Sequence, residues 1–223
     1  MIDPITIAIL AITAIFSYKG FGDYNFFDRF KFQPGPIIQH KQYDRLLTSG
    51  FLHVNTTHLL FNMLTLYFFA WYVIGFFSSH TGSVANGQLV FAIVYLAAII
   101  GGNLLSLFFQ RNNYSYSAVG ASGGVSGILF ASIVIDPNLE LYLFFFLPIK
   151  GWIFAIAYLG YSVYGMKKQL GNIGHEAHLG GSIIGLIAPI LIFPDIFEQN
   201  KIYILGMLIP IAVLFVMALK EKK

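Results

Sequence analysis

One serine and one histidine stand out as side chains that could perform chemistry together. Ser122 lies within Gly120-Ala-Ser-Gly123, and His178 lies within the string from Gly174 to Gly181. A serine hydroxyl becomes a useful nucleophile when a neighbouring base accepts its proton, and imidazole is the usual base. The pair therefore indicates acyl transfer through a Ser–His dyad.

Attack on a carbonyl also needs donors for the oxyanion that develops. His58 and Asn62 are four residues apart, so on a helix they share one face. Both can donate, as can the backbone N–H of Ser122, which begins an apolar run that reads as a helix. We expect His58, Asn62 and this N–H to form an oxyanion hole.

Simpler roles for these residues are also open. A histidine in a membrane helix often serves packing alone, and glycine with serine is frequent in such helices. Glu176 precedes His178 by two positions, which points it to another face and leaves no evident third member of a triad. His175 and His178 are three apart, whereas H-E-x-x-H zinc sites need four, so we expect no metal and no cofactor.

Composition identifies the environment in which this chemistry would occur. The chain has 223 residues, of which 57% are hydrophobic and 10% are charged. Soluble domains carry about 25% charged residues. Cysteine is absent, which excludes disulfides, thiolate metal sites and cysteine nucleophiles, and the small net charge of +3 argues against nucleic acid as a partner. We expect an all-α polytopic membrane helix bundle in one domain, 1–223, with no cleavable signal peptide at its start.

Seven apolar stretches are expected to span the membrane. They lie at about 5–18, 57–77, 88–109, 121–135, 151–166, 177–193 and 202–219. The connector from about 20 to 56 is long and aromatic, which indicates a folded element at the membrane interface. If successive spans cross the membrane in alternating directions, the second, fourth and sixth spans all begin on the same side of it. The candidate residues lie at these three beginnings.

The fourth span is unusually short. A helix over 122–135 is about 21 Å long, roughly 9 Å less than the hydrocarbon thickness. It must therefore begin below the membrane surface, which would place Ser122 at the floor of a polar cavity. Small residues four apart, Gly123 with Gly127 and Gly181 with Gly185, would let the fourth and sixth spans approach closely.

With these features, the sequence resembles the rhomboid family of intramembrane serine proteases over nearly its whole length. The matching features are Arg45, the His53-x4-His58-x3-Asn62 string, Gly120-Ala-Ser-Gly123, and Ala177-His-x-x-Gly181-x3-Gly185. The resemblance implies a six-helix core plus a seventh span, Ser122 as nucleophile, His178 as base, and His58 and Asn62 in the oxyanion hole. It further implies single-pass membrane proteins as substrates, and we expect a multi-pass protein of a bacterial inner (plasma) membrane.

Two positions depart from the family pattern. Asp44 stands where many members have tryptophan before the loop arginine, so the anchor of that loop can differ. Ser126 stands where many members have an aromatic residue packed against the base, and Gly124-Val-Ser-Gly127 is a second candidate nucleophile string. We prefer Ser122 because it lies at the mouth of the helix and matches family usage.

Orientation and activity have alternatives. The side that carries the candidate residues holds 11 of the 13 Lys and Arg residues if the spans alternate. The positive-inside rule would make that side cytoplasmic, whereas the family's active site usually opens to the other face. The alternative functions are a catalytically silent rhomboid-like protein that binds membrane proteins, or a small transporter.

Overall fold

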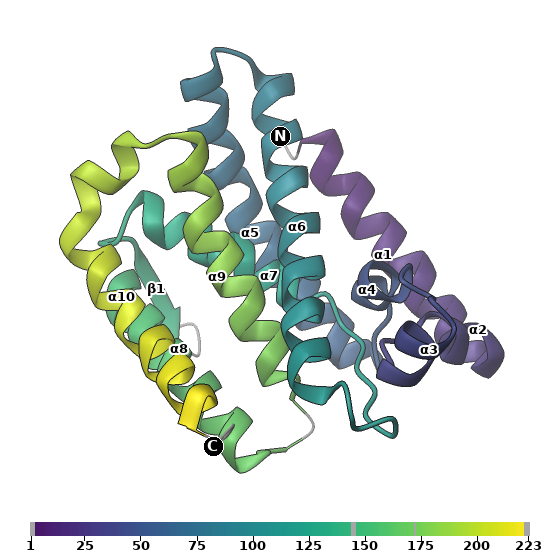
Figure 1. The fold of residues 1–223 in the computed structure, drawn as a ribbon. Coiled ribbons are helices and arrows are strands. Elements are labelled where there is room, and N and C mark those ends of the chain that lie inside the picture. Colours follow the sequence, from purple (N-terminus) through teal and green to yellow (C-terminus); the bar gives the residue numbers. More distant parts are fainter. Residues whose placement is uncertain (1–2, 144–145, 172, 221–223) are drawn as a thin grey trace.

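The computed structural model describes residues 3–143, 146–171 and 173–220, without the side chains of 214–215 and 217–220. It is a bundle of helices with one small hairpin (Figure 1). In chain order the elements are α1 (Pro4–Gly22), α2 (Tyr24–Phe30), α3 (Pro34–Gln39), α4 (Arg45–Thr48), η1 (Ser49–Phe51), α5 (Thr56–Thr81), α6 (Val84–Gln110), α7 (Ser122–Ile135), β1 (Glu140–Leu143), β2 (Leu147–Lys150), α8 (Gly151–Lys168), α9 (His175–Ile192) and α10 (Asp195–Lys220).

The short helix α7 is the centre of the bundle. All its residues from Gly123 to Val134 are buried. It packs against α9, α6 and α5, which surround it in Figure 1. Asn200 in α10 donates to the carbonyls of Val134 and Ile135 at 3.0 and 3.2 Å, which satisfies the last turn of the helix. A helix buried on all sides in this way can hold its first residue at a fixed depth.

Glycines set the distance between α7 and α9. A Cβ at Gly181 would overlap the carbonyl of Gly123, and a Cβ at Gly185 would overlap that of Gly127. The two helices therefore meet backbone to backbone, as the glycine spacing predicts. On the neighbouring face, a Cβ at Gly180 would lie 2.8 Å from the Gly101 carbonyl in α6. Helix α9, which carries His178, thus packs closely against both α6 and α7.

Within the described residues, five helices are long and apolar enough to cross a membrane, namely α1, α5, α6, α9 and the first part of α10, up to Val213. Helix α7 is a shorter apolar helix. Helix α8 occupies the expected fifth span, but it is not in that group, because its 18 residues include Lys167 and Lys168 as well as three tyrosines. Several helices begin earlier than expected because polar caps precede the apolar run. Asp3 accepts from Thr6, Asn55 from His58, and Ser83 from Asn86.

Two segments differ from the sequence expectation, while the long connector is folded, as expected. The stretch before α8 forms an antiparallel hairpin, with Glu140 paired to Lys150 and Leu141 to Ile149. The long connector holds the short helices α2, α3 and α4. Helix α10 begins at Asp195 rather than at about 202, and its backbone leaves helical geometry at Asn200 (φ −118°, ψ 15°). The expected start of that span therefore lies close to this kink.

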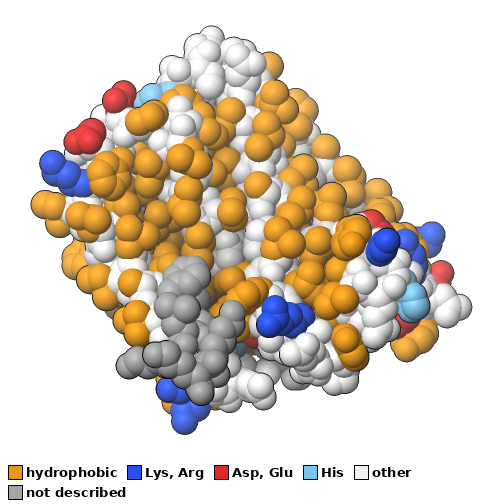
Figure 2. Space-filling view, viewed as in Figure 1, with side chains coloured by type: hydrophobic (Ala, Val, Ile, Leu, Met, Phe, Trp, Pro, Cys, Tyr) orange, Lys and Arg blue, Asp and Glu red, His pale blue; other side chains and the backbone are white. Residues whose placement is uncertain are grey.

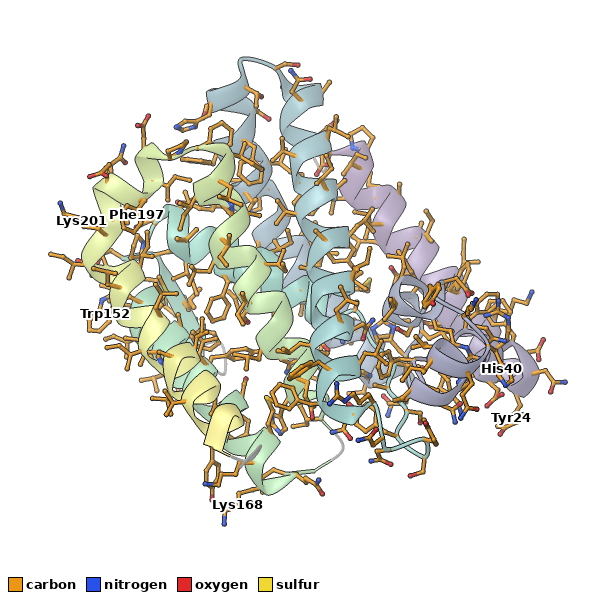
Figure 3. All side chains as sticks on the ribbon, in the orientation of Figure 1. Tyr24, His40, Trp152, Lys168, Phe197 and Lys201 are labelled. Atoms are coloured by element: carbon orange, nitrogen blue, oxygen red, sulfur yellow. The ribbon has the colours of Figure 1, made fainter. Side chains whose placement is uncertain are left out.

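The exterior is that of a membrane protein. Hydrophobic side chains spread over the face in Figure 2, and the charged ones gather toward its ends. Large apolar residues such as Trp71, Leu89 and Ile202 are more than half exposed. Lys168 and Lys201 lie toward opposite ends of the bundle in Figure 3. The chain is an integral, multi-pass, all-α membrane protein.

The α7–α9 contact generates a first prediction. Gly181→Ala should lower the free energy of unfolding by about 1–3 kcal/mol, because the methyl group is forced against the Gly123 backbone. Gly160→Ala is the matched control, since a Cβ there meets nothing within 4 Å, and it should be neutral or slightly stabilising. Unfolding in detergent micelles, followed by circular dichroism, measures both. Equal stability of the two variants would contradict the packing described.

Candidate active site

One open cavity of about 1040 Å3 brings the candidate residues together. Ser122, His178, His58 and Asn62 all line it. They come from the first two turns of α7, α9 and α5, which begin at the same end of the bundle. The three beginnings therefore share one side, as counting the crossings predicts.

The turn before Ser122 is held by the backbone. Gly120 adopts φ +137°, a conformation that side chains other than glycine rarely take. Its N–H donates to the carbonyl of Ser49 at 3.0 Å. A Cβ at Gly120 would also lie 2.7 Å from Cε1 of His58. Glycine is therefore required twice here, once for the turn and once for the histidine beside it.

The side chain of His53 supports the same turn through a hydrogen bond. The backbone N–H of Ala121 donates to Nε2 of this fully buried ring at 3.3 Å. Since Nε2 accepts, the proton is assigned to Nδ1, which donates to Oγ of Ser17 at 2.9 Å. Burial, helped by the charge of His58, lowers the pKa of His53 to about 3. A neutral His53 thus ties α1 to the residue before the nucleophile candidate.

Ser122 and His178 share the cavity without a direct hydrogen bond. In this structure neither Oγ of Ser122 nor a ring nitrogen of His178 has a hydrogen-bond partner among the described residues. The backbone of His178 is fixed, because its N–H donates to Gly174 at 3.0 Å and its carbonyl accepts from Ser182 at 2.8 Å. Catalytic hydrogen bonds are often long before a substrate closes the site. The absence of a hydrogen bond between Ser122 and His178 is therefore compatible with a dyad.

The oxyanion candidates lie beside the serine. A Cβ built on Gly120 would be 3.1 Å from Nε2 of His58 and 3.7 Å from Oγ of Ser122, so both groups face the same small volume. Asn62 donates one N–H to the His58 carbonyl at 3.0 Å, and its amide has a second N–H to offer. The ring of His58 also packs edge-on against His53, with centroids 4.9 Å apart.

The second serine has a different environment. Ser126 is 4% exposed and does not line the cavity. Its hydroxyl lies 2.6 Å from the hydroxyl of Tyr158 in α8. The ring of that tyrosine stacks on His178, with centroids 6.1 Å apart and an interplanar angle of 23°. An aromatic ring thus does pack on the histidine, but it comes from α8 and not from position 126.

Sequence reasoning missed Tyr158 and gave His53 no role. A signal for Tyr158 was available in the small residue at position 126, which leaves room for a ring beside His178. His53 lies within the His53-x4-His58-x3-Asn62 string, but its partners Ser17 and Ala121 are distant in sequence. Only the fold reveals that these groups touch.

The connector before α5 also pairs with the loop before Ser122 through Phe32. Phe32 and Ala118 exchange hydrogen bonds of 3.0 and 3.1 Å, which links the connector to the loop before Ser122. Arg45 is buried and donates to the carbonyls of Asp28 and Lys31 at 2.7 and 2.8 Å. Arg45 thus ties the start of α4 to the segment around α2.

Asp44 and Glu176, two acidic residues considered in the sequence analysis, have partners of their own. Asp44 pairs with Arg29 at 2.8 Å, so it ties α4 to α2. Glu176 is 6% exposed and accepts from Gln110 in α6 at 2.7 Å. It lines the cavity, but its hydrogen bond goes to the amide and not to His178. The structure gives His178 no carboxylate partner among the described residues.

Comparison with known proteins identifies the family. Residues 40–195 match the model of the Rhomboid domain. RHOMBOID-like protein 12, mitochondrial, of Arabidopsis thaliana is 30% identical over 159 residues, which are 64% of this chain and 44% of that protein. Rhomboid protein 1, mitochondrial, of Saccharomyces cerevisiae is 30% identical over 149 residues, 64% of this chain and 40% of that protein. Rhomboid protease GluP of Bacillus subtilis is 29% identical over 155 residues, 68% of this chain and 26% of that protein.

The matches span less than half the length of these relatives. Two of the three are named as mitochondrial and one comes from a bacterium, so they do not support the expected bacterial plasma membrane. The domain match covers well over half of the chain and includes every candidate residue. This chain belongs to the rhomboid family.

Proposed function

We propose that this chain is a serine endopeptidase that cleaves transmembrane segments of single-pass membrane proteins. The observation that carries the proposal is the shared cavity, lined by Ser122, His178, His58 and Asn62. Membership of the rhomboid family supports intramembrane proteolysis in general, and the similarity to a protein named as a rhomboid protease agrees with it.

The proposed reaction proceeds through an acyl-enzyme. Oγ of Ser122 attacks the scissile carbonyl carbon while His178 takes the hydroxyl proton. The negative oxygen is stabilised by N–H groups of His58, Asn62 and the Ser122 backbone. As the C–N bond breaks, His178 returns the proton to the leaving amine. Water then attacks the ester by the same proton transfers, which releases the acid and regenerates Ser122. No cofactor is needed.

The position of the site favours an unusual substrate. Ser122 begins a helix of 14 residues, too short to cross the hydrocarbon layer, so the site lies beneath the headgroups. A peptide bond inside a helix already has its carbonyl hydrogen-bonded and shielded. We therefore propose substrates whose spans unwind readily, and lipid as the surrounding partner.

Two other functions remain to be tested against this one. A catalytically silent member would bind membrane proteins but not react at Ser122. A transporter would move solute whether or not Ser122 is intact. The described parts of α5, α7 and α9 hold one acidic residue, Glu176, and it is paired with an amide, which gives a transport pathway little support.

The dyad predicts that Ser122→Ala and His178→Ala each abolish cleavage of a model single-span substrate and abolish labelling by a fluorophosphonate. Purified protein in detergent or in vesicles, analysed by gel shift and mass spectrometry of the labelled peptide, measures both effects.

Ser132→Ala is the matched control for that experiment. This serine is on the same helix, is fully buried, and donates to the Leu129 carbonyl at 2.7 Å, away from the cavity. The Ser132→Ala variant should be labelled by the fluorophosphonate at the wild-type rate. Normal cleavage by Ser122→Ala, or a label found on Ser126, would refute the assignment, and the absence of any label on wild type would favour a silent binder.

The oxyanion hole predicts a separate kinetic signature. Asn62→Ala should lower kcat on the order of 100-fold with little change in KM, because the lost N–H acts only in the transition state. Asn62→Asp should be slower still, since a carboxylate there repels the developing charge. Steady-state kinetics with the single-span substrate tests this. A change in KM alone would remove Asn62 from the oxyanion hole.

We propose that the mouth of the cavity faces the extracytoplasmic side, as is usual for the family. The excess of basic residues on this side counts against it. Several of them have structural partners, however. Arg29 pairs with Asp44 and Lys31 with Asp28, both at 2.8 Å, and Arg45 is buried. These side chains are placed by the fold of the connector.

Because the chain has no cysteine, single substitutions report its orientation cleanly. Lys168 and Lys201 are exposed toward opposite ends of the bundle (Figure 3). In right-side-out vesicles, a membrane-impermeant maleimide should label Lys168→Cys and spare Lys201→Cys until detergent is added. The reverse pattern would place the cavity mouth on the inner side.

A further inference from the structure

Tyr158 is the one aromatic side chain in the described structure that stacks on the ring of His178. It belongs to α8, whereas the proposed nucleophile and base belong to α7 and α9. It does not line the cavity, so it does not meet a substrate there. Any effect of Tyr158 on chemistry must therefore pass through His178.

The stack constrains the base in two ways. A near-parallel ring at 23° lies over one face of the imidazole and limits its rotation, which restricts the directions that its nitrogens can take. The electron-rich face of the tyrosine also attracts the imidazolium that forms when His178 takes the serine proton. The first effect concerns orientation, and the second concerns the charged state.

The tyrosine ring is itself held in place. Its hydroxyl meets Oγ of Ser126 at 2.6 Å, and Ser126 is buried. Phe154 stacks on its ring at 5.6 Å and 29°, and Phe130 packs beside it at 5.7 Å. A buried hydrogen bond and two ring contacts leave little freedom for the tyrosine.

Ser126 links this arrangement to the nucleophile. It lies four residues after Ser122, so both occupy one face of α7 a turn apart. A continuous series of contacts thus runs from Ser126, through the Tyr158 hydroxyl and ring, to the imidazole of His178. Helix α7 and His178 are joined through a third helix, although Ser122 and His178 are not hydrogen-bonded to each other.

Helix α10 supports α8 from the other side. Ala155 and Leu159 of α8 are fully buried in one core with Ile204 and Met207 of α10. Trp152 packs against Tyr203 at 6.0 Å, near the start of α8 (Figure 3). These contacts fix the part of α8 that carries Tyr158.

From this geometry we propose that Tyr158 is a positioning residue for the base, and that its hydrogen bond with Ser126 sets its place. The inference rests on the proposed function, since it assigns a role in the same reaction. It also explains how a serine at position 126 is compatible with an oriented histidine, because the required ring enters from α8.

The test compares four variants for kcat, KM and the rate of fluorophosphonate labelling. Tyr158→Leu removes the ring and should lower kcat and the labelling rate on the order of 10- to 100-fold, because a misdirected base costs that much. Its KM should stay within about twofold, since Tyr158 makes no substrate contact. Tyr158→Phe keeps the stack and loses the hydroxyl, so it should fall between wild type and Tyr158→Leu.

The decisive variant moves the ring to the other helix. Because the Ser126 and Tyr158 side chains touch, exchanging them (Ser126→Tyr with Tyr158→Ser) roughly conserves the buried volume. The exchange should recover much of the rate that Tyr158→Leu loses. Tyr164→Leu is the matched control, because this tyrosine is on the same helix and 53% exposed, and it should behave as wild type.

The outcomes separate the two proposals. If wild type is not labelled at Ser122, the proposed function fails whatever the tyrosine variants do. If wild type is labelled and Tyr158→Leu keeps a normal kcat, the positioning role is wrong. Tyr158→Leu could instead raise KM and lower the thermal midpoint together with kcat. If neither Tyr158→Phe nor the exchange variant then recovers activity, Tyr158 is a packing residue only.

Discussion

The close approach of α7 and α9 is the constraint on which the rest of this structure depends. Hydrophobic force does not draw helices together within a membrane, so contact must come from backbone packing. Gly123 and Gly127 face Gly181 and Gly185 with no room for a side chain between them. Because Ser122 precedes the first of these glycines and His178 lies one turn before Gly181, that packing determines how far apart the two can be.

A second constraint fixes the depth and direction of the serine. Helix α7 is short and buried on all sides, and the Gly120 turn before it is pinned by Ser49 and by a neutral His53. The connector pairs with the same loop through Phe32 and Ala118. Segments that precede α6 thus hold the turn, while α6 packs against the helix of His178 and Tyr158 of α8 stacks on its ring.

Much of this could be predicted from the sequence, because its signals are local. Apolar runs predicted the long apolar helices, the run after Ser122 predicted a short helix there, and glycine spacing predicted which helices meet. The hairpin at 140–150 was missed because a short apolar run has no feature that separates strand from helix. The contacts of His53 and Tyr158 join residues 68 and 20 positions from their partners Ala121 and His178, and no periodicity encodes such pairs.

The structure of a covalent adduct would test the central claim most directly. Protein reacted with a fluorophosphonate should show phosphorus bonded to Oγ of Ser122. One phosphoryl oxygen should lie within hydrogen-bonding distance of His58, Asn62 and the Ser122 backbone, with the His178 ring still stacked on Tyr158. An adduct on Ser126, or a phosphoryl oxygen directed away from all three donors, would contradict the account.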